Sequence, residues 1–146
     1  LILVGSIREN FKKNFLENLN SNIKHYNFTN KIFKYYKNAD CFVMPSYREG
    51  LSRAILEASC LKLPILASNV PGCRELVKNN FNGYLFNVNQ QESIRNALKK
   101  ILFLKNKKLL AMGERSRLIV KKSYTEKEVI NIYLTNIHRL DNEKKI

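Results

Sequence analysis

The fold of this chain is decided by the stretch Pro45-Ser46-Tyr47-Arg48-Glu49-Gly50-Leu51-Ser52-Arg53-Ala54-Ile55-Leu56-Glu57-Ala58. The apolar run 41–45 that leads into it is typical of a buried parallel strand. From Leu51 to Leu61 apolar side chains recur at helical spacing, so one helix face is expected to pack on a sheet. Gly50 allows a close backbone approach, and the first amides of a helix have no partners inside it. This junction therefore predicts a phosphate-binding position.

The same alternation of short apolar runs and longer amphipathic segments extends in both directions. It indicates βαβ crossovers and predicts an α/β fold: a doubly wound, Rossmann-like parallel sheet of about five strands with helices on both faces and a helical C-terminal tail. The spacing of Asn89 to Glu92 and of Thr125 to Glu128 predicts two capped helix starts. The expected strands are 1–5, 23–28, 41–45, 65–68 and 84–88, and the expected helices are 11–19, 31–37, 51–61, 73–78, 92–104, 107–122 and 126–140.

Two carboxylates flank the predicted phosphate position, Glu49 before the helix and Glu57 along it. An ionised carboxylate accepts hydrogen bonds and suits hydroxyl groups rather than phosphate. A ligand with hydroxyls on both sides of a diphosphate, such as a nucleotide-sugar, would fit both residues. The alternative from spacing alone is structural: Glu49 as a first-turn helix charge and Glu57 as an ion-pair partner of Arg53.

Composition limits the remaining possibilities. The 146 residues carry a formal net charge of +14 and are 45% hydrophobic, which excludes a disordered basic tail. No apolar stretch is long enough for a membrane-spanning helix. The basic residues are concentrated in residues 91–146, so a basic module that binds nucleic acid or an anionic membrane is the alternative function. Three cysteines without metal-type spacing favour a reducing cytoplasm.

Successive blocks around Glu49 and Glu57 resemble the C-terminal domain of the retaining GT-B glycosyltransferases of family 4. The two glutamates form an E-x7-E pattern, and the resemblance extends over roughly residues 1–140. It implies a nucleotide-sugar (donor) binding domain over 1–122, lacking its first strand, followed by a C-terminal helix and tail over 123–146. The matching blocks are Ala39-Asp40-Cys41-Phe42-Val43-Met44-Pro45-Ser46, Glu49-Gly50, Leu56-Glu57-Ala58, Pro64-Ile65, Val70-Pro71-Gly72-Cys73-Arg74-Glu75 and Asn82-Gly83-Tyr84-Leu85.

The resemblance implies a role for each matching position. Glu57 would accept hydrogen bonds from ribose hydroxyls, and Glu49 would orient hexose hydroxyls of the donor as the catalytic residue. The nucleotide base would lie near the end of the second strand, although this chain has Asn27 where the family commonly has Gly. The implied diphosphate-binding amides are those of Gly50, Leu51 and Ser52, the implied base-binding residues are Phe28 and Thr29, and the candidates in the donor loops are Ser46, Gly72, Cys73 and Arg74.

No metal is expected at this site. The only aspartates are Asp40 and Asp141, so an Asp-x-Asp metal site is absent from the sequence, and no other cofactor is implied. In the family, an Arg and a Lys from the first strand–loop–helix neutralise the leaving diphosphate. This chain reads as beginning at the second strand, with Leu1 inside it, so we expect residues 1–146 to be catalytically silent alone.

The partners follow from the same resemblance. They are a nucleotide-sugar donor, an N-terminal GT-B domain outside this sequence, and a lipid-linked or surface-glycan acceptor. The sequence of the blocks is similar to that of bacterial enzymes of polysaccharide biosynthesis, which often use UDP-linked hexoses or N-acetylhexosamines. We therefore expect a hexosyltransferase in the cytoplasm, at the inner face of the cytoplasmic membrane through peripheral contact, and no nucleic-acid partner.

Overall fold

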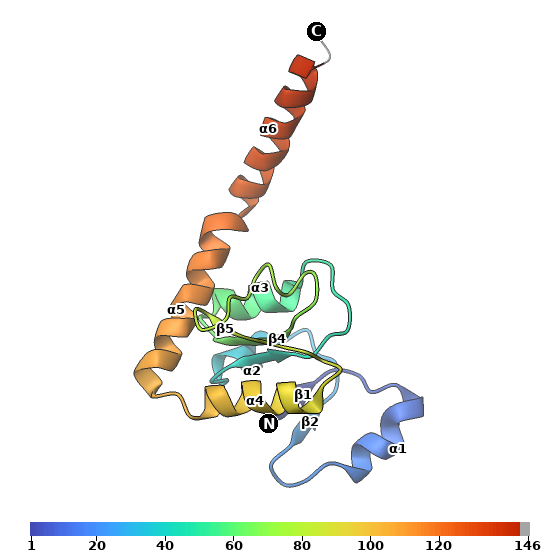
Figure 1. The fold of residues 1–146 in the computed structure, drawn as a ribbon. Helices are drawn as coiled ribbons and strands as arrows, with labels where there is room; N and C mark the ends of the chain where they lie inside the picture. The colour runs from blue at the N-terminus through green and yellow to red at the C-terminus, as the bar shows by residue number, and fades with distance from the viewer. Residues whose placement is uncertain (144–146) are drawn as a thin grey trace. The chain divides into compact units, whose positions relative to one another are not determined.

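A computed structural model describes residues 1–143, apart from the side chains of Leu16 and of residues 136–143. The chain divides into two compact units, Leu1–Asn38 and Ala39–Ile146, and each has its own parallel sheet (Figure 1). The predicted α/β class with about five parallel strands is confirmed, but the strands divide into a pair and a group of three. The predicted boundary at residues 122 and 123 falls at the end of a helix, and it stays a prediction.

The N-terminal unit contains two strands and two helices: β1 (Ile2–Val4), α1 (Glu9–Glu17), β2 (Lys24–Tyr26) and α2 (Phe33–Lys37). The strands pair in parallel with Ile2 opposite Lys24, and the ring of His25 hydrogen-bonds the carbonyl oxygen of Gly5 at 2.8 Å. Among its described side chains, only Tyr36 is buried. The strands match the predicted runs but are shorter.

The second unit is built on the sheet β3-β4-β5, with all three strands parallel. Phe42 pairs with Ile65, and Ile65 pairs with Gly83 on the other side, so β4 is the central strand and is buried throughout. The elements of this unit are β3 (Phe42–Met44), α3 (Arg53–Cys60), β4 (Ile65–Ser68), β5 (Gly83–Phe86), α4 (Gln91–Leu102), α5 (Asn106–Ser123) and α6 (Glu126–Glu143).

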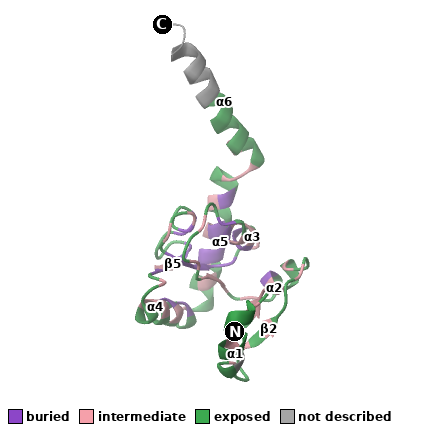
Figure 2. Ribbon diagram, turned by 90° about the vertical axis from the view of Figure 1, so that its right-hand side faces the viewer, coloured by how far each residue is buried: buried purple, intermediate pink, exposed green. Residues whose placement is uncertain are grey.

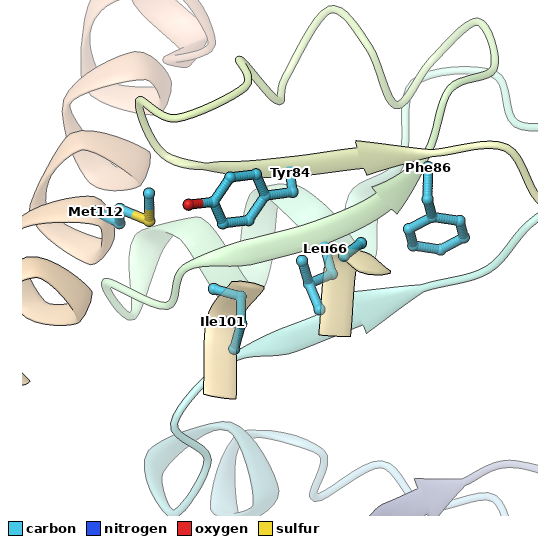
Figure 3. Packing of buried hydrophobic residues seen from close by; sticks show 6 residues of the cluster. Leu66, Tyr84, Phe86, Ile101 and Met112 are labelled. Carbon is cyan, nitrogen blue, oxygen red and sulfur yellow. The ribbon is translucent and has the colours of Figure 1, made fainter. Parts of the chain in front are cut away.

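Helices cover both faces of this sheet, as predicted. Side chains alternate along β4, so Leu66 points to one face while Ile65 and Ala67 point to the other. Leu66 packs in one cluster with Tyr84 and Phe86 of β5 and with residues from α4 and α5 (Figure 3). Helix α3 lies on the opposite face in Figure 1 and contributes fully buried apolar side chains. Figure 2 shows the buried residues concentrated in this unit.

Helix α5 closes the end of the sheet where β4 and β5 begin. A Cβ on Gly113 would overlap the carbonyl oxygen of Lys62, so only glycine permits this approach to the turn before β4. The buried hydroxyl of Ser116 donates to the carbonyl oxygen of Asn82, just before β5, at 3.3 Å. The amino ends of these strands therefore face α5, and their carboxyl ends are left for the loops described next.

The predicted helix over 73–78 is wrong. Residues 71–76 form consecutive turns instead, and the reason is Asn82. Its side-chain amide donates to the carbonyl oxygen of Leu76 at 2.9 Å, and its side-chain oxygen accepts from the amide of Lys78 at 2.7 Å. These bonds occupy backbone groups that a continuing helix would pair within itself.

Candidate functional site

The predicted site residues of the second unit gather at the carboxyl ends of two neighbouring strands. Residues 45–52 connect β3 to α3, and residues 69–76 follow β4. Because β3 and β4 are parallel neighbours, both loops leave the same edge of the sheet. The hydroxyl of Ser68 donates to the carbonyl oxygen of Met44 at 3.3 Å and ties the two strand ends together. The loops therefore lie side by side.

Gly72 brings the two loops into direct backbone contact. Its φ is +83°, and a Cβ at this position would overlap the carbonyl oxygen of Gly50 and approach that of Glu49. The amide of Ser52 donates to the carbonyl oxygen of Gly72 at 3.4 Å. Only glycine satisfies both the backbone angle and the space, so Gly72 sets the distance between the two predicted donor loops.

Glu49 is held in place by a residue of its own loop. The hydroxyl of Ser46 donates to Oε1 of Glu49 at 2.7 Å, and both side chains are half-buried. A hydrogen bond to an ionised carboxylate is among the stronger ones. The carboxylate is thus pre-oriented at one oxygen, and the second oxygen can accept bonds from a ligand hydroxyl.

Glu75 belongs to the site region, although the sequence analysis did not single it out. Its Oε2 accepts a hydrogen bond from the amide of Gly72 at 2.6 Å, and its Oε1 lies 3.7 Å from Nε of Arg74. Glu75 therefore fixes the loop backbone through Gly72, whereas its long pair with the exposed Arg74 contributes little. A Glu three residues after Gly72 is the spacing of a capping interaction, which was the available signal.

Cys73 lies between these carboxylates as a protonated thiol. The side chain is fully buried, and burial together with the charges of Glu49 and Glu75 raises its pKa to about 11. A thiol with this pKa has little thiolate near neutral pH and is a poor nucleophile. Cys73 is suited to packing and not to covalent chemistry.

The start of α3 offers unpaired polar groups. Ser52 is the N-cap residue, yet its side chain makes no capping bond, and its buried hydroxyl has no partner. In the described part of the chain, the amides of Gly50 and Leu51 meet no acceptor. Amides and a hydroxyl at the positive end of a helix form the donor set that binds a phosphate group.

Glu57 lies one turn further along α3. Its Oε1 is 3.9 Å from an Nη of Arg53, whose side chain is 90% exposed, whereas that of Glu57 is 32% exposed. An ion pair this long to a solvated arginine contributes little. The structural alternative for Glu57, an ion pair with Arg53, is therefore present, and about a third of the Glu57 side chain is exposed.

Phe28 and Thr29 belong to the other unit, after β2. The ring of Phe28 is 73% exposed, and the hydroxyl of Thr29 accepts a hydrogen bond from the amide of Lys31 at 3.1 Å. Their predicted contact with the nucleotide base stays a prediction.

Among the described residues, no three His, Cys, Asp or Glu side chains are grouped so that they could hold a metal ion. Within that same range, none of the helices combines the length and apolar character needed to cross a bilayer.

The chain is similar in sequence to known glycosyltransferases. Residues 1–119 match the family model described as glycosyl transferases group 1. The chain is 32% identical over 117 residues to UDP-Gal:alpha-D-GlcNAc-diphosphoundecaprenol alpha-1,3-galactosyltransferase of Escherichia coli, covering 80% of this chain and 30% of that protein. It is 39% identical over 83 residues to N,N'-diacetylbacillosaminyl-diphospho-undecaprenol alpha-1,3-N-acetylgalactosaminyltransferase of Campylobacter jejuni, covering 56% and 22%.

A solved structure shares the fold. The crystal structure of Anabaena Alr3699/HepE in complex with UDP-glucose superposes with a TM-score of 0.78 at 21% identity, covering 97% of this chain and 40% of that one. The chain spans less than a third of the length of the two curated relatives named above.

Proposed function

The chain belongs to the glycosyl transferases group 1 family and has the fold of a GT-B C-terminal domain, and from this premise we propose that it forms the donor-binding part of a retaining hexosyltransferase. The observation that carries the proposal is the contact of Gly72 with Gly50. It brings together two loops, a pre-oriented carboxylate and the unpaired donors at the start of α3.

The diphosphate of the donor would lie at the start of α3. The amides of Gly50 and Leu51 would face this position, and the hydroxyl of Ser52 adds a third donor. The amide of Ser52, also expected to bind the diphosphate, donates instead to the carbonyl oxygen of Gly72. A buried hydroxyl without a partner costs about 1–3 kcal/mol, and a phosphate oxygen would remove that cost. No metal or other cofactor is required at this end of the diphosphate, because the helix terminus supplies positive potential.

The two glutamates would recognise the sugars on either side of the diphosphate. Glu57, on α3, would accept hydrogen bonds from the ribose hydroxyls. Glu49, held by Ser46, would orient the hydroxyls of the transferred hexose. Phe28 and Thr29 would lie near the base. Ser46, Gly72, Cys73 and Arg74 would act through the shape of the donor loops, with Arg74 next to Glu75.

The names of the relatives support a donor and an acceptor. Two of them transfer galactose or N-acetylgalactosamine to diphosphoundecaprenol-linked sugars, and the fold neighbour binds UDP-glucose. We therefore propose a UDP-linked hexose or N-acetylhexosamine as donor and a lipid-linked glycan as acceptor, used in the cytoplasm at the inner face of the membrane. The acceptor site and the cations for the leaving diphosphate would come from an N-terminal GT-B domain, so residues 1–146 alone would bind donor without transferring sugar.

Glu57→Ala tests the ribose assignment. Calorimetry with UDP should show the binding free energy weakened by about 1.5–3 kcal/mol, the range for a hydrogen bond to a charged group. Glu92→Ala is the matched control, because Glu92 pairs with Arg95 on α4 as Glu57 pairs with Arg53 on α3. Equal UDP affinity for the two variants would reject the ribose assignment.

Glu49→Gln tests the sugar assignment separately. The substitution keeps size and removes charge, so UDP should bind within about 0.5 kcal/mol of the unmodified chain. Competition among UDP-hexoses should instead show a changed order of affinity. If UDP loses more affinity than the intact donors, Glu49 contacts the nucleotide and the assignment is wrong.

A further inference from the structure

The corner where α4 meets α5 exposes large apolar side chains among lysines. We call it the α4–α5 corner and define it by three apolar residues and four lysines. Leu102, Phe103 and Leu110 are 75%, 85% and 70% exposed. The lysines, all exposed, are Lys99, Lys105, Lys107 and Lys108.

The fold holds these apolar side chains outward. Ile101 is buried in the core, and Leu104 and Leu109 pack against the same cluster. The amide of Phe103 donates to the carbonyl oxygen of Lys99 at 3.1 Å, and that of Leu104 donates to Ile101. Because Ile101 and Leu104, on either side, are held in the core, Leu102 and Phe103 cannot turn inward without displacing them. Their exposure is built into the turn.

The charge of the corner is uncompensated. Between Arg95 and Glu114 the chain has five lysines and no acidic residue. Lys100 lies over the ring of Tyr84 at 5.4 Å, whereas the four corner lysines form no ion pair with any carboxylate of the described residues. This leaves a positive surface around the exposed apolar groups.

Helix stability explains only some of these lysines. Lys99 lies in the last turn of α4, where a positive charge is favourable. Lys107 and Lys108 lie in the first turn of α5, which contains no acidic residue, and there the helix dipole opposes them. These two lysines therefore do not stabilise the start of α5, and helix stability does not explain their presence.

The corner lies at the end of the sheet opposite the donor loops. Lys100, next to it on α4, contacts Tyr84 near the start of β5, and α5 covers the amino ends of β4 and β5. The donor loops leave the carboxyl ends of the strands. In Figure 1 the junction of α4 and α5 forms an outer edge of this unit. A partner bound at the α4–α5 corner would therefore leave the start of α3 accessible to a donor.

We propose that the α4–α5 corner docks on a bilayer containing acidic phospholipids. The lysines would meet the headgroup phosphates, and Phe103 with the two leucines would enter the interface between headgroups and acyl chains. Nucleic acid is the less favoured polyanion, because a phosphate backbone gives three exposed apolar side chains nothing to bury against. The docking does not depend on the donor site, and its test uses neither donor nor acceptor.

The test is sedimentation of residues 1–146 with vesicles of phosphatidylglycerol mixed with phosphatidylcholine, compared with pure phosphatidylcholine. Binding should require phosphatidylglycerol and weaken as salt rises. Lys107→Gln/Lys108→Gln should lower the partition coefficient about 30-fold, from about fivefold for each lysine near an anionic surface. Phe103→Ser should lower it about tenfold.

Matched control variants on α5 distinguish an effect of the corner from an effect of the total charge or total hydrophobicity of the chain. Lys121→Gln/Lys122→Gln removes the same charge at exposed positions, and Leu118→Ser replaces a side chain that is 60% exposed. Both should bind vesicles within about twofold of the unmodified chain, with circular dichroism confirming that all variants fold. Equal losses in corner and control variants, no binding to acidic vesicles, or a loss of RNA binding that matches the loss of vesicle binding would each overturn the proposal.

Discussion

The two units of this protein differ in what their strands bury. In the N-terminal unit, the residues of β1 and β2 are exposed or half-buried, and Tyr36 is the one buried side chain that the structure describes there. In the second unit, every residue of β4 is buried. Helix α3 covers one face of the strand, and on the other face Leu66 packs with Tyr84, Phe86 and residues of α4 and α5. β1 and β2 therefore have much less buried surface to stabilise them than β4, as expected for a two-stranded sheet.

The largest expected effect is the removal of a core ring from the second unit. Phe86→Ala should lower the free energy of unfolding by about 3–5 kcal/mol, because Phe86 is 2% exposed. Phe11→Ala in the N-terminal unit, at 59% exposure, should change it by no more than about 0.5 kcal/mol. Urea unfolding followed by circular dichroism measures both. Comparable losses would contradict the contrast between the units.

Substitution of two glycines with positive φ tests how much close packing adds to the stability cost of backbone strain. Gly72→Ala should cost about 3 kcal/mol or more, because backbone strain adds to overlap with Gly50. Gly5→Ala carries strain at φ +145°, but a Cβ there meets nothing within 4 Å, so about 1–2 kcal/mol is expected. Thermal unfolding of the two variants gives the difference. A larger loss at Gly5 would show that strain, and not packing, dominates.

The smallest effect, taken per pH unit, is a dependence of stability on alkaline pH that arises from Cys41 and Cys73, both in the second unit. Burial, followed by the charge of Asp40, raises the pKa of Cys41 to about 11, and Cys73 has a similar value. The folded chain then holds these protons above pH 9.0, where unfolded thiols lose them. Stability should therefore fall as pH rises from about 9 to about 11, by at most about 1.4 kcal/mol per pH unit for each thiol.

Cys73→Ala isolates one of these thiols. Its free energy of unfolding should decline less steeply over the same pH range than that of the unmodified chain, as measured by urea unfolding at a series of pH values. Cys60→Ala is the control, because Cys60 is exposed. Identical slopes for all three proteins would remove Cys73 as a source of the pH dependence.

Local patterns predicted most elements of the fold. The run Ile65–Ser68 is a strand as expected, and the capped start at Thr125 is confirmed by the amide of Glu128, which donates to its hydroxyl at 3.3 Å. The predicted cap at Asn89 is wrong. Helix α4 begins at Gln91, and the hydroxyl of Ser93 accepts instead from the amide of Asn87 at 2.9 Å. Several polar residues compete at that helix start, and spacing alone does not rank them.

Contacts between distant segments were beyond the reach of local patterns. The resemblance implied Glu49, Gly50 and Gly72 as site residues, but the close backbone approach of Gly72 to Gly50 appears only in the structure. The bonds from Asn82 that prevent a helix over 73–78 also depend on the fold, since Asn82 reads as an ordinary turn residue before Gly83. The unpaired hydroxyl of Ser52 is likewise visible only once its surroundings are packed.

The position of α5 in the chain has a consequence for synthesis on the ribosome. Met112, on α5, completes the cluster around Tyr84 and Phe86, so the strands are translated before the helix that covers part of them. Until α5 emerges, Tyr84 and Phe86 lack part of their cover in the nascent chain. While α5 is still inside the ribosome, the emerged strands would therefore present an open apolar face, the kind of intermediate that chaperones bind.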